Sequence, residues 1–209
     1  MAITFPLSTP TNIGIANIVL GAESAFAISQ SPFTFVQQVV KHPGERWKAS
    51  ISLPPMKRID SEPWVSFLLS LNTVQYVSGV GYYGTFLLGD PNGADAQGSA
   101  STLPGTPLVN GGSQTGNTLV IDGCPASKIG YLKAGDYIQL GSGSSSRLYK
   151  VLTDTNTNGS GQATLDIWPA LRNSPSDNDP VVVSNTKGLF RLSSNIQQWE
   201  INDISSYGI

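Results

Sequence analysis

The sequence predicts a mainly β protein: a β-sandwich domain with one short helix, plus an inserted small antiparallel β-barrel or sandwich. Three observations predict it. Charged residues make up only 12% of the 209 residues, about half of the roughly 25% usual for soluble domains. Gly and Pro supply 22 and 14 positions, and such turn-formers disfavour a helical bundle. Short apolar stretches also recur between Gly-, Asn- and Ser-rich turns, which is typical of antiparallel β folds.

The clearest strand pattern occupies residues 46–53. Apolar side chains alternate there with Arg, Lys and Ser, so that one face carries Trp47, Ala49, Ile51 and Leu53. Upstream, the apolar residues of 33–40 predict a preceding strand, and residues 42–45 (His-Pro-Gly-Glu) have the Pro-Gly chemistry of a turn. We therefore expect a hairpin whose turn lies at residues 42–45.

One helix is predicted from about Ser61 to Leu71. Asp60 or Ser61 caps its start, and Pro63 falls in its first turn. Four apolar side chains then follow the i, i+3, i+4, i+7 spacing of one helical face: Trp64, Phe67, Leu68 and Leu71. That face is expected to lie on the sheet, and residues 84–91 predict a short buried strand that ends in a Gly-Asp-Pro turn.

A long connection divides the chain. Residues 92–118 are rich in Gly, Pro and Asn and contain no Lys or Arg, which is the composition of a flexible connection. We take residues 92–104 as a linker and residues 105–185 as an inserted β-rich module. Its short strands are expected at 118–121, 137–140, 147–152, 163–168 and 180–184, a spacing that favours a small antiparallel barrel or sandwich.

The C-terminal segment differs from the module in composition. Phe190, Leu192, Trp199 and Ile201 stand in a polar background, and such aromatic and aliphatic side chains are rarely left in water. Their simplest location is an extra strand in the sheet of the first domain. We therefore expect a discontinuous β-sandwich domain made of residues 1–91 and 186–209.

The composition argues against several classes of function. A net charge of -2 at pH 7 does not favour a nucleic-acid-binding protein, and no apolar run reaches the roughly 18 residues of a membrane helix. Cys124 and His42 are single, which excludes a four-ligand Cys/His zinc site, and no nucleophile elbow provides a partner for His42. Residues 154–159 resemble the start of a calcium loop, but Leu165 stands where the closing Glu is needed. We predict no enzyme, no catalytic residue, no cofactor and no metal.

Aromatic residues leave a second hypothesis open. Trp168 lies at the end of a predicted strand, and with Tyr149 it is a candidate contact for a glycan or a partner protein. Core packing is the competing interpretation of the Trp residues. The alternative function is a carbohydrate-binding module that recognises a cell-surface glycan through such exposed rings.

Several segments share their pattern with a known family. In the first domain these are residues 47–54 (WKASISLP), the Trp64 to Leu71 helix and residues 84–91 (GTFLLGDP). In the second module they are residues 132–138 (LKAGDYI), 148–151 (LYKV) and 163–172 (ATLDIWPALR). Together they resemble bacteriophage distal tail proteins of the tail tip and baseplate, over most of the chain and without a catalytic signature.

The resemblance implies a structural subunit of the virion. Members of this family form a ring at the end of the tail tube, commonly a hexamer, which joins the tube to the hub and to receptor-binding or fibre proteins. The N-terminal β-sandwich makes the ring and the second module faces outward. For this chain the resemblance implies self-association, assembly in the host cytoplasm, a place at the tail tip or baseplate, and no membrane or sequence-specific nucleic-acid partner.

Overall fold

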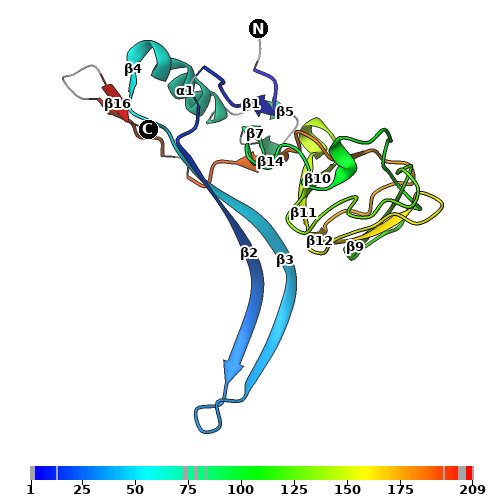
Figure 1. Cartoon of the computed structure of the whole chain (residues 1–209). Helices are drawn as coiled ribbons and strands as arrows, with labels where there is room; N and C mark the ends of the chain where they lie inside the picture. The colour runs from blue at the N-terminus through cyan, green and yellow to red at the C-terminus, as the bar shows by residue number, and fades with distance from the viewer. Residues whose placement is uncertain are drawn as a thin grey trace.

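Three parts make up the molecule: a projecting hairpin, a unit that carries the only long helix among the described residues, and a β-barrel (Figure 1). The structure is a computed structural model that describes residues 3–12, 14–72, 75–77, 80–82, 84–194, 196–201 and 206–208. Most of its regular elements are strands. The predicted fold class, a mainly β chain with one helix and a small antiparallel barrel, is confirmed.

The hairpin consists of β2 (Asn17–Gln30) and β3 (Gln37–Ser52), which pair antiparallel. The prediction of a turn at residues 42–45 was wrong, because the chain reverses at residues 31–36, where the Ser31 N–H donates to the Val36 carbonyl at 3.0 Å. Residues 42–44 instead form an irregularity within β3, between the pairs Ser24–Glu45 and Phe26–Lys41. A bulge tolerates Pro43, which has no N–H to give to a ladder.

The helical unit is built around α1 (Arg58–Leu71). A small sheet of β1 (Leu7–Ser8), β7 (Thr85–Leu88) and β14 (Gly188–Arg191) lies beside it, in the order β1-β7-β14. The unit also contains β4 (Met56–Lys57), β5 (Gln75–Val77), β6 (Val80–Tyr82), β15 (Glu200–Ile201) and β16 (Ser206–Gly208). Its core comprises Met56, Trp64, Phe67, Leu71, Phe86 and Leu88.

The helix begins three residues before the predicted start. Ser61 is fully buried inside the first turns, where its hydroxyl donates to the Arg58 carbonyl at 3.1 Å instead of capping the helix. The predicted apolar face is confirmed, because Trp64, Phe67 and Leu71 are buried.

The C-terminal segment pairs with strands of the first part of the chain. β14 runs antiparallel to β7, with Phe190 opposite Phe86, and β16 pairs with β4. The rings of Phe86 and Phe190 have centroids 6.1 Å apart. The barrel is therefore inserted between two adjacent antiparallel strands.

The barrel has six strands in the order β13-β10-β11-β12-β9-β8. These are β8 (Leu108–Val109), β9 (Gly116–Asp122), β10 (Tyr137–Leu140), β11 (Arg147–Val151), β12 (Ala163–Leu171) and β13 (Val181–Val182). The two ends of this order join, because the Val181 N–H donates to the Pro107 carbonyl and the Val109 N–H to the Asp179 carbonyl, both at 2.9 Å. The sheet thus closes on itself around an apolar core.

Residues 92–104 do not behave as the flexible linker that their composition suggested. They contain η1 (Ser99–Ser101), and Ala100 packs in the barrel core. The backbone N–H groups of Gln97 and Gly98 donate to the buried Asp136 carboxylate at 2.7 and 3.1 Å. A second short turn of helix, η2 (Gly143–Ser145), connects β10 and β11. Gly and Pro serve here to shape a packed loop, which composition alone does not distinguish from a linker.

Candidate functional site: the projecting hairpin and the groove at its root

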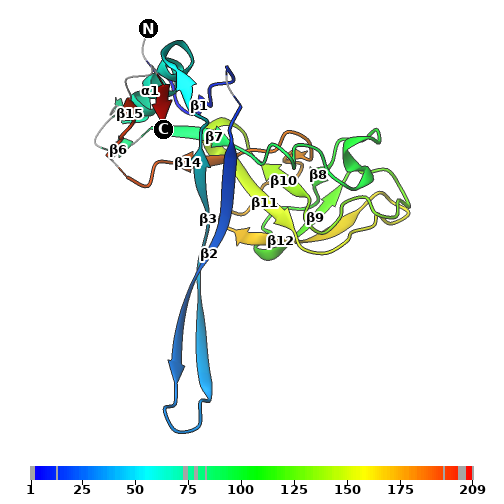
Figure 2. The same ribbon diagram turned by 60° about the vertical axis from the view of Figure 1, so that its left-hand side comes forward.

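The distal half of the hairpin, residues 25–44, extends away from the rest of the molecule (Figure 2). Nearly every residue in it is exposed, including Phe33 at 90%. Seven of the exposed residues are large and apolar: Phe26, Ile28, Phe33, Phe35, Val36, Val39 and Val40. Apolar side chains at this density on a projecting element mark an interaction surface.

The strand register gathers part of this apolar surface on one face. Ile28 lies opposite Val39, and Phe26 lies two residues before Ile28 on the same strand, so the three side chains share a face. Phe33, Phe35 and Val36 lie at the turn. Residues 26–40 contain no Asp, Glu, Lys, Arg or His. Charge depletion of this kind is typical of the core of a protein interface.

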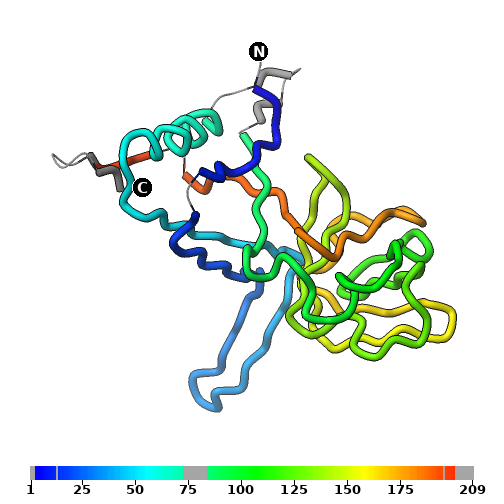
Figure 3. Tube along the Cα trace, turned by 45° about the horizontal axis from the view of Figure 1, so that its top comes forward, coloured from blue at the N-terminus to red at the C-terminus, as the bar shows by residue number. Residues whose placement is uncertain are grey.

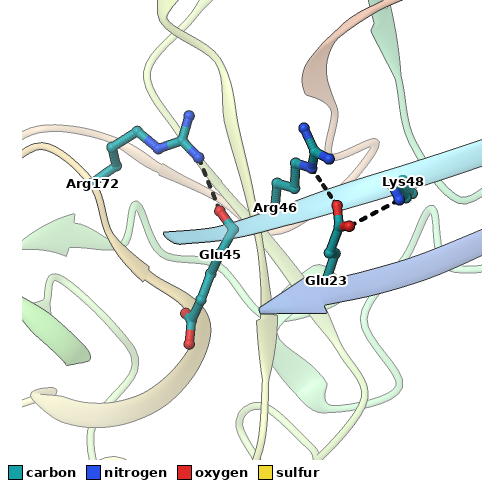
Figure 4. Close-up of polar contacts among 5 residues, drawn as sticks. All are labelled: Glu23, Glu45, Arg46, Lys48 and Arg172. Atoms are coloured by element: carbon teal, nitrogen blue, oxygen red, sulfur yellow. Dashed lines mark hydrogen bonds and ion pairs between the residues drawn. The ribbon is translucent and has the colours of Figure 1, made fainter. Parts of the chain in front are cut away.

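The base of the hairpin is fixed to the barrel by Glu45 of β3. Its side chain is buried, and its Oε2 accepts a hydrogen bond from the Ala170 N–H at 2.6 Å. Arg172 donates from Nη2 to the Glu45 carbonyl at 2.9 Å (Figure 4). Burial raises the pKa of Glu45, but the Lys41 ammonium at 2.6 Å and the Ala170 N–H outweigh burial, so that the pKa is lowered overall.

A second ionic group links the two strands of the hairpin. The Glu23 carboxylate accepts from Arg46 Nε and from Lys48 Nζ, the latter at 2.9 Å (Figure 4). Hydrogen bonds from these two cations lower the pKa of Glu23 to about 2. The group connects β2 to β3 near the root, and exposed ion pairs of this kind contribute little stability.

Trp47 forms the aromatic centre of the junction between hairpin and barrel. Its indole N–H donates to the Leu148 carbonyl at 2.9 Å, and its ring meets Trp168 edge-on with centroids 4.6 Å apart. Trp168 is half-buried by this contact, and Tyr149 is only 3% exposed within the barrel core. Tyr149 therefore lacks the solvent-exposed ring that a glycan contact requires, and Trp168 offers only part of its surface.

A groove of about 780 Å³ lies where the hairpin root, the helical unit and the barrel meet. Figure 3 shows the root of the hairpin passing between the other two parts. The groove is lined by side chains from segments far apart in the sequence, among them Ile51, Trp64, Phe67, Leu68, Phe190 and Leu192. Arg147, Arg172 and Arg191 also line it. The groove is thus largely apolar, with cationic side chains among its lining residues.

The residues considered for catalysis or metal binding lie apart from this groove. His42 is exposed in β3, and Cys124 is buried at the barrel, where burial raises the pKa of its thiol. Turn carboxylates accept backbone N–H groups, as Asp154 does from Ala134 at 2.9 Å and Asp177 from Gly111 at 2.7 Å. Within the described part of the chain, no cluster of three or more His, Cys, Asp or Glu side chains is arranged to hold a metal ion.

The sequence analysis did not identify the distal hairpin as a candidate interaction surface. It assigned Phe33 and Phe35 to a strand and gave no role to Phe26 and Ile28. Their period-two spacing before Ser31-Pro32 was the available signal.

Among the helices that the structure describes, none combines the length and the apolar character needed to cross a membrane. No protein-family model matches the chain, and no curated protein matches it in sequence.

Proposed function

We propose that this chain is a non-enzymatic structural subunit of a phage tail tip or baseplate, which assembles with copies of itself into a ring. The ring would join the tail tube to the hub and to host-binding components. The observation that best supports self-assembly is the projecting hairpin with its exposed apolar side chains. The sequence resemblance described above supports the place of the ring in a virion.

The distal part of the hairpin, residues 25–44, has little stability of its own in water. Two strands alone are marginally stable, and this pair has free edges along residues 25–44. Covering one large apolar side chain is worth about 1.5–3 kcal/mol, so covering the seven partly exposed ones is worth on the order of 10 kcal/mol before the cost of association. This energy favours a partner at the hairpin.

The barrel suits a second role as an attachment platform. Its core is independent of the hairpin, because its six strands close on themselves and enclose their own apolar residues. The Glu45 and Trp47 contacts then hold it at a fixed position beside the hairpin root. In the proposed ring each barrel would face outward, where hub, fibre or receptor-binding proteins attach.

The experiment compares the full chain with a variant whose hairpin is shortened. Replacing residues 25–44 by Asn-Gly joins the paired residues Ser24 and Glu45 through a two-residue turn. Native mass spectrometry is expected to find a closed ring for the full chain and a monomer for the variant, whose circular dichroism keeps the barrel signal. Immunogold labelling is expected at the tail end. The proposal is contradicted if the full chain remains monomeric. It is also contradicted if the full chain cleaves glycans and loses this activity when a pair of its carboxylates is mutated.

A further inference from the structure

We infer that the groove at the hairpin root receives the hairpin tip of a second copy, so that subunits join head to tail. Here the tip means residues 26–40. This inference rests on the proposed function, because it names the two surfaces through which the ring would form. The length of the hairpin, the chemistry of its tip and its exposed apolar surface favour a second copy of the chain as the occupant.

The length of the strands prevents a tip from reaching the groove of its own chain. Trp47 lines the groove and Gln37 begins β3 beside the turn. With a rise of about 3.3 Å per residue, the ten steps between them place the tip about 30 Å away. Because residues 45–51 of the same hairpin form one wall of the groove, only another molecule can supply the tip.

The chemistry of the tip fits the groove. The groove is walled by apolar rings and aliphatic chains of the helical unit, and the tip presents Phe33, Phe35 and Val36. An uncharged tip also brings no like charge against the arginines of the groove.

The tip has apolar surface that such a contact would bury. The three Phe side chains of the hairpin offer on the order of 400 Å² of exposed surface at their observed exposures. The four exposed aliphatic side chains add to this area. The groove of about 780 Å³ has room for several of these side chains.

Such a contact has a consequence for symmetry. The tip and the groove are different surfaces of one chain, so the interface is heterologous, and each subunit gives one tip and receives another. Repetition of the contact produces a closed ring when the rotation closes. A subunit without a functional tip still receives a neighbour, and a subunit without a functional groove still provides a tip.

This reciprocity gives a direct test with two variants. Phe33→Glu places a charge at the tip, and Leu68→Glu places one in the groove. Each variant alone is expected to be monomeric in native mass spectrometry. An equimolar mixture is expected to form a dimer and nothing larger, because only one intact tip and one intact groove remain. Leu69→Glu is the matched control, since Leu69 is 49% exposed on α1 and does not line the groove. It is expected to form the full ring.

Cysteine cross-linking gives a second readout in a Cys124→Ala background, because Cys124 is the chain's single cysteine. Phe33→Cys and Leu68→Cys are expected to form a disulfide only when mixed, whereas Phe33→Cys with Leu69→Cys is expected to form none. The inference is overturned if the full chain forms rings but the mixture of the two glutamate variants stays monomeric. It is also overturned if Leu68→Glu assembles normally, which is the result expected if the groove binds an acidic peptide instead of the hairpin tip. Those outcomes leave the proposed function standing, while a monomeric full chain removes both.

Discussion

Replacement of Glu45 by Ala tests how the hairpin is fixed to the barrel. The side chain of Glu45 is 2% exposed and accepts the Ala170 N–H at 2.6 Å, so truncation leaves that N–H without its acceptor. The cost of an unsatisfied buried donor is about 1–3 kcal/mol. The lost ion pair adds at most about 1 kcal/mol, because the Lys41 side chain is 59% exposed. We expect a loss of about 2–3 kcal/mol.

The assay combines urea unfolding with amide hydrogen exchange at Ala170. In Glu45→Ala, the unfolding midpoint is expected to fall and the Ala170 amide to exchange faster, while amides in β9 keep their protection. Glu45→Gln is the control, because its amide oxygen still accepts the Ala170 N–H and only the ion pair is lost. If Glu45→Ala unfolds like the parent chain with an unchanged Ala170 amide, the carboxylate does not fix the hairpin.

Four further predictions concern the pH dependence of Glu45, the Asp136 carboxylate, the C-terminal segment and Trp168. Because the pKa of Glu45 is lowered from its ordinary value of 4.5, its stabilising contribution is present above pH 4.5 and is lost as the pH falls through the lower folded value. Urea midpoints are expected to fall more steeply with falling pH in the parent than in Glu45→Gln, where Glu23, whose pKa is also lowered, still contributes. Asp136→Ala removes the acceptor of three backbone N–H groups in the barrel and is expected to cost about 3 kcal/mol in urea unfolding, with Asp136→Asn intermediate. Deleting residues 186–209 removes β14 from its pairing with β7 and is expected to cause aggregation, measured by light scattering. Trp168→Ala removes the ring against Trp47 and is expected to lower the thermal midpoint, whereas loss of binding on a glycan array by a monomeric protein would support the carbohydrate-binding alternative.

The regular parts of the fold could be predicted because their signals are local. The period-two pattern around Ile51, the helical spacing from Trp64 to Leu71 and the short strands of the barrel each depend on neighbours in the sequence. The hairpin turn could not be placed this way. Pro43-Gly44 is a strong turn signal, but it lies in a bulge of β3, while the true turn contains no Gly and places Phe35 at a φ of 55°.

The groove lay beyond local reasoning for a different reason. Its walls come from β2, β3, α1, β7, β11, β12 and the segment around β14. No periodicity connects these segments, which come together where Glu45 and Trp47 bind the hairpin root to the barrel. The sequence does show that most of these residues are apolar and that several are cationic. It does not show that they face a common space.

The attachment of the barrel has a consequence for how such a protein changes during evolution. The chain leaves β7 after Leu88 and re-enters β14 at Gly188, and these two residues are register partners. A Cβ on Gly89 would lie 2.1 Å from the Thr186 carbonyl oxygen, so the outgoing and returning chains pass in close contact. The whole barrel thus occupies the position of a hairpin loop. A lineage can exchange it for another module, or lose it for a short turn, without reordering a single strand of the sheet that remains.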